Sequence, residues 1–134
     1  MVSTRPRQDE AMQLGPEGQR LTRVLVDFDI CLEFERGDSI ALGDFSIDGP
    51  KTPASPPNNV GYATIAQGLS LALQMIGATC VSAEVNESGD LSVVFADGTA
   101  ISSPHSDGEA WEFSGSNGGR VISGPTGDLS IWTT

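Results

Sequence analysis

Residues 80–101, CVSAEVNESGDLSVVFADGTAI, decide the fold. Apolar and polar residues alternate on both sides of Ser88-Gly89 and again up to Asp97-Gly98. This period of two indicates strands with one buried face. Both dipeptides supply residues that tolerate positive φ, which narrow hairpin turns require. The stretch therefore predicts a meander of three short antiparallel strands.

An earlier stretch, RLTRVLVDFDICLEFERGDSI at residues 20–40, repeats this design, and Ser39 to Ile47 is expected to be its third strand. Val24 and Val26 correspond to Ala83 and Val85. The second strand and its turn correspond as well, with Ile30, Leu32, Phe34 and Gly37 matching Leu91, Val93, Phe95 and Gly98. Two related three-stranded units are the simplest account. The alternative is that short amphipathic hairpins resemble one another without duplication.

The C-terminal part predicts a third meander. Trp111 and Phe113 alternate with polar residues, which places both on one buried face. Glycine-rich turns follow at 116–119 and 124–127, and Leu129 to Trp132 is the last expected strand. Trp132 and Ile131 point to opposite faces, so one of the two side chains should be partly exposed.

Residues 64–76 carry a helix signal. Thr64-Ile65-Ala66-Gln67 has the form of a capping box, and Gly77 is placed to end the helix. Apolar residues fall on one helical face at Ile65, Leu69, Ala72, Leu73 and Ile76. The expected fold class is therefore α+β, with mostly antiparallel meanders of about eight or nine short strands and one helix packed on the sheet.

The length of 134 residues predicts a single domain. Residues 1–16 are polar and unpatterned, which predicts a disordered N-terminal tail before a domain at 17–134. Residues 49–62 are rich in proline and predict a surface loop. The first residues lack an apolar signal segment, and no apolar stretch is long enough for a membrane span. We expect a cytoplasmic protein with no membrane association.

The charge balance is strongly acidic. Seven Lys and Arg stand against eighteen Asp and Glu, for a net charge of −11. After Lys51 the only basic residue is Arg120. Such a surface repels nucleic acid phosphates and attracts basic partners. We therefore expect no nucleic acid partner; the simpler explanation of the acidity is solubility.

The parts of a familiar catalytic or metal site are missing. Cys31 and Cys80 lack a CxxC spacing, and His105 is the only histidine. No serine stands in a G-x-S-x-G turn, and the glycine clusters lack the Lys-Ser/Thr of a phosphate loop. His105, Asp107 and Glu109 alternate, but in a segment typical of a turn. We expect no enzyme activity, no cofactor and no metal, with free thiols rather than a Cys31–Cys80 bridge.

Strand alternation predicts an acidic surface instead. If the apolar residues face inward, five carboxylates face outward on neighbouring strands, and Trp132 is a further candidate contact. These expected partner-binding residues are Asp27, Glu33, Glu35, Glu84, Glu112 and Trp132. Like charges held together repel one another, and a basic partner would relieve that repulsion. The competing interpretation is an ordinary solvated sheet face.

The terminal segment EAWEFSGSNGGRVISGPTGDLSIW, residues 109–132, resembles a family of small bacterial domains of unknown function. These domains end in E-A-W-E-[LF]-x-G followed by G-[DE]-L-x-[IV]-W, and the resemblance covers about Leu21 to Trp132. It implies a compact acidic domain similar to immunity proteins, which neutralise a secreted toxin in the producing cell. The family supplies no catalytic residue, so none is carried over.

Three hypotheses of function follow. The first is a non-enzymatic protein-binding domain, an immunity or inhibitor protein that occludes a basic partner such as a secreted toxin. The second is a carrier of a small ligand, with a pocket between the helix and the sheet. The third is a structural or accessory domain without a soluble partner.

Overall fold

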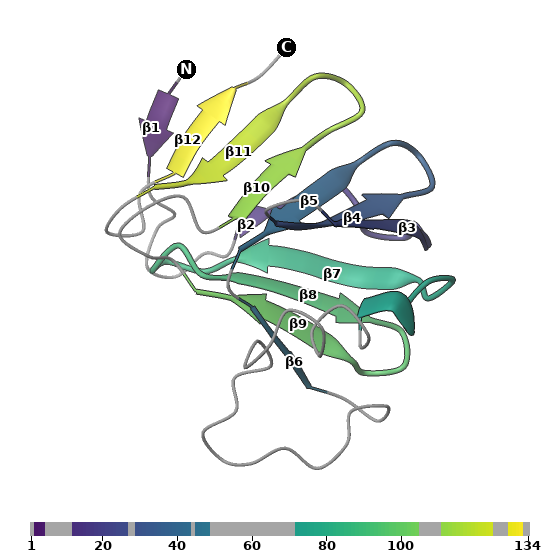
Figure 1. Ribbon diagram of the computed structural model, residues 1–134. Coiled ribbons are helices and arrows are strands. Elements are labelled where there is room, and N and C mark those ends of the chain that lie inside the picture. The colour runs from purple at the N-terminus through teal and green to yellow at the C-terminus, as the bar shows by residue number, and fades with distance from the viewer. Residues whose placement is uncertain are drawn as a thin grey trace.

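The computed structural model describes residues 2–4, 12–26, 29–43, 45–48, 72–104, 111–124 and 129–132. They form two antiparallel sheets that pack against each other (Figure 1). The seven-stranded sheet has the order β1-β12-β11-β10-β5-β4-β3, and the five-stranded sheet has the order β2-β7-β8-β9-β6.

The strands are short. In the larger sheet they are β1 (Val2–Thr4), β3 (Leu21–Val26), β4 (Ile30–Phe34), β5 (Ser39–Leu42), β10 (Trp111–Ser114), β11 (Arg120–Ser123) and β12 (Leu129–Trp132). In the smaller sheet they are β2 (Met12–Gln13), β6 (Ser46–Asp48), β7 (Cys80–Val85), β8 (Leu91–Phe95) and β9 (Ala100–Ser103).

All three expected meanders are present, as β3-β4-β5, β7-β8-β9 and β10-β11-β12. The pairing registers place corresponding residues of the first two meanders alike. Leu32 lies opposite Val24 in the first, and Val93 lies opposite Ala83 in the second. Both first strands carry a register shift, between Leu21 and Arg23 and between Cys80 and Ser82.

These register shifts change which residues face inward. Simple alternation groups Val81 with Ala83 and Val85, yet Val81 is exposed while the other two are fully buried. The extra residue of a bulge reverses the phase of everything before it. Cys80 is therefore the buried residue at this end of β7.

The expectation of an α+β fold is wrong. The described residues are antiparallel strands and contain no helical element, so the fold is nearly all β. Residues 64–71 of the predicted helix lie outside the described part. Within 72–77 only Ala72 and Leu73 have helical geometry, and a turn follows. The two sheets bury each other's apolar faces, so a helix is not needed to cover either one.

The predicted third strand at Ser39–Ile47 is also two strands. β5 ends at Leu42 and belongs to the larger sheet, whereas β6 begins at Ser46 and pairs with β9 in the smaller one. Leu42 and Phe45 are both buried, which breaks the period of two where the chain crosses between the layers. Because each piece alternates regularly by itself, the sequence of the two pieces together resembles one continuous strand.

Two strands lie in the N-terminal stretch where a disordered tail was expected. β1 pairs with β12, and β2 pairs with β7. Leu14, just after β2, is buried in the core. The predicted loop at 49–62 lies outside the described residues.

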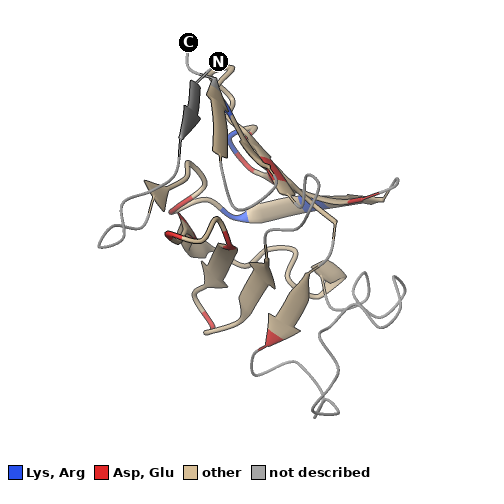
Figure 2. Ribbon diagram, turned by 90° about the vertical axis from the view of Figure 1, so that its left-hand side faces the viewer, with Lys and Arg blue, Asp and Glu red and all other residues tan. Residues whose placement is uncertain are grey.

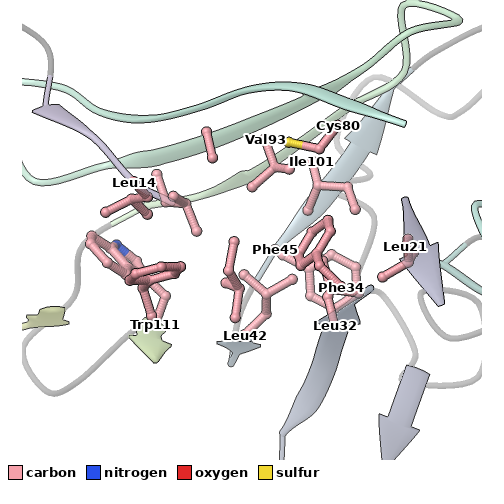
Figure 3. Close-up of a cluster of buried hydrophobic side chains, with 14 of the residues drawn as sticks. Leu14, Leu21, Leu32, Phe34, Leu42, Phe45, Cys80, Val93, Ile101 and Trp111 are labelled. Atoms are coloured by element: carbon pink, nitrogen blue, oxygen red, sulfur yellow. The ribbon is translucent and has the colours of Figure 1, made fainter. Parts of the chain in front are cut away.

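The core lies between the sheets. Side chains from both layers meet there, among them Leu32, Phe34, Leu42, Val93, Ile101 and Trp111 (Figure 3). Trp111 is 2% exposed, and its indole N–H donates a hydrogen bond to the Gly89 carbonyl at 3.1 Å. The expectation that Trp111 and Phe113 are core residues is confirmed. One apolar core therefore joins the larger sheet to the β7–β8 turn.

Candidate protein-binding surface

The outer face of the five-stranded sheet carries a row of polar residues that crosses every strand. In the strand register, Gln13 lies opposite Glu84 and Glu84 opposite Ser92. Ser92 in turn lies opposite Ser102, and Ser102 opposite Ser46. Each residue alternates with core residues on its own strand, so its side chain points away from the core. Neighbouring strands lie about 4.8 Å apart, which makes the row a continuous polar track.

The part of this track from Glu84 to Ser46 lines a hollow of about 430 Å³. The serines are small, so they leave space where longer side chains would fill it. The polar lining is Ser46, Glu84, Asn86, Asp90, Ser92, Ser102 and Ser103. Hydroxyl and carboxylate oxygens therefore converge on one open surface of the smaller sheet.

One end of the hollow is held by defined hydrogen bonds. The Gln13 side-chain amide donates to the Glu84 carboxylate. The Asn86 side-chain oxygen accepts the backbone N–H groups of Ser88 and Asp90, at 2.9 and 3.0 Å. The Asn86 bonds fix the β7–β8 turn beside Asp90, and the Gln13 bond holds the Glu84 side chain at the border of the hollow.

The predicted partner-binding residues do not form one face. Glu33, Glu35 and Glu112 lie on or beside strands of the larger sheet, whereas Glu84 lies on the smaller sheet. Asp27 and the side chain of Trp132 lie outside the described residues. The pattern of alternation correctly turns the four described carboxylates outward, but it cannot say which sheet each strand joins.

Arginines neutralise the carboxylates of the larger sheet. Arg23 pairs with Glu33 at 3.4 Å. Arg120 forms a close ion pair with Glu112. These pairs lie across neighbouring strands or within a hairpin, where opposite charges stabilise each other modestly. The larger sheet is therefore not the uncompensated acidic field that the sequence predicts.

Glu35 is the most firmly held of these carboxylates. The backbone N–H of Arg20 donates to it at 3.0 Å, and the Arg20 guanidinium lies 3.4 Å away. The backbone hydrogen bond, followed by the guanidinium charge, lowers the pKa of this exposed carboxyl group. Glu35 therefore stays ionised and paired.

The smaller sheet differs in the charged residues that it carries. Its strands contain no Lys or Arg, and the segment 72–104 that supplies three of them holds Glu84, Glu87, Asp90 and Asp97. Among the residues that the structure describes, Figure 2 shows the basic ones around the larger sheet and acidic ones on both sheets. The uneven charge is therefore a property of one sheet, and the serine hollow lies on that sheet.

The cysteines do not add reactive groups to this surface. Both are free thiols, and Cys80 is buried while Cys31 is half-buried. Burial raises the pKa of Cys31 and raises the pKa of Cys80 to about 11. Since the thiolate is the reactive form, both side chains are poor nucleophiles at neutral pH.

The structure adds residues that sequence reasoning missed, namely Gln13 and the three serines of the track. The available signal was a serine at the outward position of consecutive strands, at Ser92 and Ser102. Ser46 carries no such signal, because its strand was expected in the other meander. Among the described residues no group of three or more His, Cys, Asp and Glu is placed to hold a metal ion.

Comparison with known proteins gives a family. The model of a family of unknown function, DUF6188, matches residues 12–133. The chain belongs to this family. The DUF6188 match spans all the described strands except β1. Neither the curated proteins nor the solved structures contain a match to this DUF6188 chain. No helix in the described part of the chain is long and apolar enough to cross a membrane.

Proposed function

We propose that the chain is a non-enzymatic protein-binding domain that recognises a basic segment of its partner through the outer face of the five-stranded sheet. The observation that carries this proposal is the contrast between the sheets. One balances its carboxylates with arginines, while the other has acidic residues and no Lys or Arg on its strands. An immunity or inhibitor protein that occludes a basic toxin domain would use such a surface.

The hollow suits a cationic side chain of the partner. A Lys or Arg that enters it would meet Glu84 and Asp90 at the border and serine hydroxyls along the floor. Hydrogen bonds between a cation and a carboxylate are stronger than those between neutral groups. The attraction also speeds association and is screened by salt, with a Debye length of about 10 Å at 0.1 M.

The test uses two variants of equal net charge. Glu84→Gln with Asp90→Asn changes the border of the hollow on the smaller sheet, and Glu33→Gln with Glu35→Gln changes the larger sheet. The probe is a nine-residue arginine peptide titrated into labelled protein and followed by NMR. We expect shifts at Glu84, Ser92 and Ser102, weaker binding in the first variant, and little change in the second.

Two results would reject the proposal. Equal weakening in both variants would mean that net charge alone attracts the peptide. Shifts centred on β4 and β10 would place the basic segment on the larger sheet. If the peptide test succeeds, a toxin-like gene beside this one in the source genome supplies the first natural partner to assay.

The hollow also favours a second candidate function, a small-ligand carrier. Its lining would suit a polar ligand with hydroxyl or ammonium groups, held on an outer sheet face rather than between a helix and a sheet. Native mass spectrometry of the purified protein tests this. A bound small molecule that is lost in a Ser92→Leu variant would support the carrier function, and an unliganded mass would oppose it.

A further inference from the structure

The two repeated meanders meet about an approximate two-fold axis. The Gly18 N–H donates to the Cys80 carbonyl at 2.7 Å, and the Gly77 N–H donates to the Leu21 carbonyl at 2.7 Å. Gly18 of the first repeat corresponds to Gly77 of the second, and Leu21 corresponds to Cys80. Exchanging the two repeats therefore converts each of these hydrogen bonds into the other. Both glycines also have positive φ, at 83° and 96°.

A second pair of bonds obeys the same exchange. The Cys80 N–H donates to the Gln19 carbonyl at 2.8 Å, and the Leu21 N–H donates to the Ala78 carbonyl at 2.9 Å. Arg20 and Thr79, which also correspond, form an antiparallel bridge with each other. The correspondence therefore holds along the whole junction of β3 and β7.

The symmetry fails at one place. In the second repeat, β2 covers the outer edge of β7, with Met12 opposite Val85. Just after β2, the Leu14 N–H donates to the Ala83 carbonyl at 2.8 Å. In the first repeat the equivalent edge, Val24 to Val26 of β3, is terminal in its sheet, and no described strand pairs with it.

Exposure marks the same place. Val85 is fully buried, whereas its counterpart Val26 is 52% exposed, and Leu25 beside it is 38% exposed. The Ala83 N–H and carbonyl both point away from β8, toward Glu17 and Leu14. By the same correspondence the backbone groups of Val24 and Val26 point to the open edge. An unpaired apolar edge of this kind is a template for another strand.

We infer that a second copy of this chain pairs with β3, antiparallel and about a two-fold axis at Leu25. This register places Val24 opposite Val26 of the second copy, and the outward backbone groups of both then form hydrogen-bonded pairs. The sequence Val24-Leu25-Val26 is self-complementary about Leu25, as an isologous contact requires.

Charge supports a second copy at this edge. Two chains of net charge −11 repel each other, so they associate best where charge is locally balanced. Arg23 and Arg20 balance Glu33 and Glu35 along β3 and β4. The acidic smaller sheet remains free, so this association is independent of the proposed function.

Sedimentation equilibrium over a concentration series tests the inference. We expect reversible dimers in the unmodified chain. Leu25→Lys and Leu25→Glu each place like charges opposite each other at the axis, which should weaken association about fivefold or more. An equimolar mixture of the two variants should restore dimers, because opposite charges then face each other. Val81→Lys, at a strand residue of β7 that is even more exposed than Leu25, should have no effect.

Hydrogen exchange supplies a second measurement. Protection of the Val24 and Val26 amides should increase with protein concentration. Protection that does not depend on concentration would show that the chain covers its own edge, and would overturn the inference. A chain that stays monomeric throughout, or a dimer that Leu25→Lys leaves intact, would also overturn it. Arginine-peptide binding should be the same in Leu25→Lys, which separates this test from the previous one.

Discussion

At the scale of single residues, corresponding positions of the two repeats have taken different roles. Asp38 accepts the Gln19 side-chain amide at 2.6 Å and the Ser116 N–H at 2.8 Å, and both Gln19 and Asp38 are buried. In the second repeat their counterparts are Ala78 and Thr99. Ala78 has no amide to donate, and the buried Thr99 hydroxyl has no partner among the described residues. The first repeat therefore has a buried polar network that the second lacks.

Replacing Thr99 by Val should stabilise the protein. The change keeps the shape and removes a buried hydroxyl whose missing hydrogen bond costs about 1–3 kcal/mol. We expect a gain of about 1 kcal/mol in the free energy of unfolding, measured in urea. Thr22→Val is the matched control, since the Thr22 hydroxyl donates to the Glu33 carbonyl at 3.1 Å. Thr22→Val should lower the free energy of unfolding, because it removes this hydrogen bond. An equal loss in Thr99→Val would contradict this account.

Glu17 should make stability depend on pH. Burial raises the pKa of this carboxyl group, although the Ala83 N–H donates to it at 3.1 Å. The folded protein therefore holds the proton more tightly than the unfolded chain, and the stability from the neutral form is lost as pH rises through the folded pKa. Glu17→Gln should gain stability relative to the unmodified chain as the pH rises from below to above the ordinary pKa of a Glu side chain, about 4.3. A constant difference across that range would exclude Glu17 as the cause.

Sequence patterns predict much at this scale. Ile30, Leu32 and Phe34 face the core as alternation requires, while Glu33 faces solvent. Val81 is the exception, because alternation cannot locate a bulge before the strand pairing is known. The ion pair of Arg23 with Glu33 was missed for the same reason, since it depends on the register of β3 against β4.

At the scale of elements, the junction between the repeats depends on backbone shape. Gly18 and Gly77 have positive φ, and no atom lies within 4 Å of where a Cβ would stand. Substitution by Ala therefore strains the backbone without a steric clash. Positive φ costs a non-glycine residue about 1–2 kcal/mol.

Gly18→Ala and Gly77→Ala should destabilise the protein by similar amounts, about 1–2 kcal/mol each, because they occupy equivalent places. Chemical denaturation measures both. Gly98→Ala is a useful reference, since Gly98 also has positive φ and open space, but its N–H bonds within its own turn, to the Phe95 carbonyl, rather than across the junction. A large effect at one junction glycine and none at the other would argue against the two-fold relation.

The elements were partly predictable. Strands β7, β8 and β9 follow from local alternation and from turns at Ser88-Gly89 and Asp97-Gly98. The division of 39–47 into β5 and β6 does not, because the crossing is decided by which sheet each piece pairs with. The helix prediction at 64–76 failed as a guide to fold class, since it assumed that the sheet needed a helical cover. The serine hollow depends on that same layer arrangement, so it was not predictable.

At the scale of the molecule, the two sheets share one core. Leu32 and Val93 hold equivalent positions in different sheets, and both are fully buried in the same cluster. Trp111 lies between the layers and reports on both by fluorescence (Figure 3). Neither layer keeps an apolar interior without the other.

Leu32→Ala and Val93→Ala should therefore each lower the free energy of unfolding of the whole protein, which should still unfold in a single transition. Leu→Ala in a core costs about 2–5 kcal/mol, and the shorter Val93 should cost less. Fluorescence and far-UV circular dichroism should give coincident unfolding curves in both variants. Curves that separate, or a second transition in either variant, would show that the layers unfold independently.

The crossing of the chain from β5 to β6 has a consequence for biosynthesis. β5 and β6 leave the ribosome together, and β5 can pair at once with β4. The strands that pair with the other edge of β5 and with β6, which are β10 and β9, are translated only later. Until those partners arrive, the nascent chain exposes the apolar face of β3-β4-β5 and an unpaired β6, and exposed species of this kind are prone to aggregation. Slow translation after β6, or early chaperone contact, should thus affect the yield of native protein.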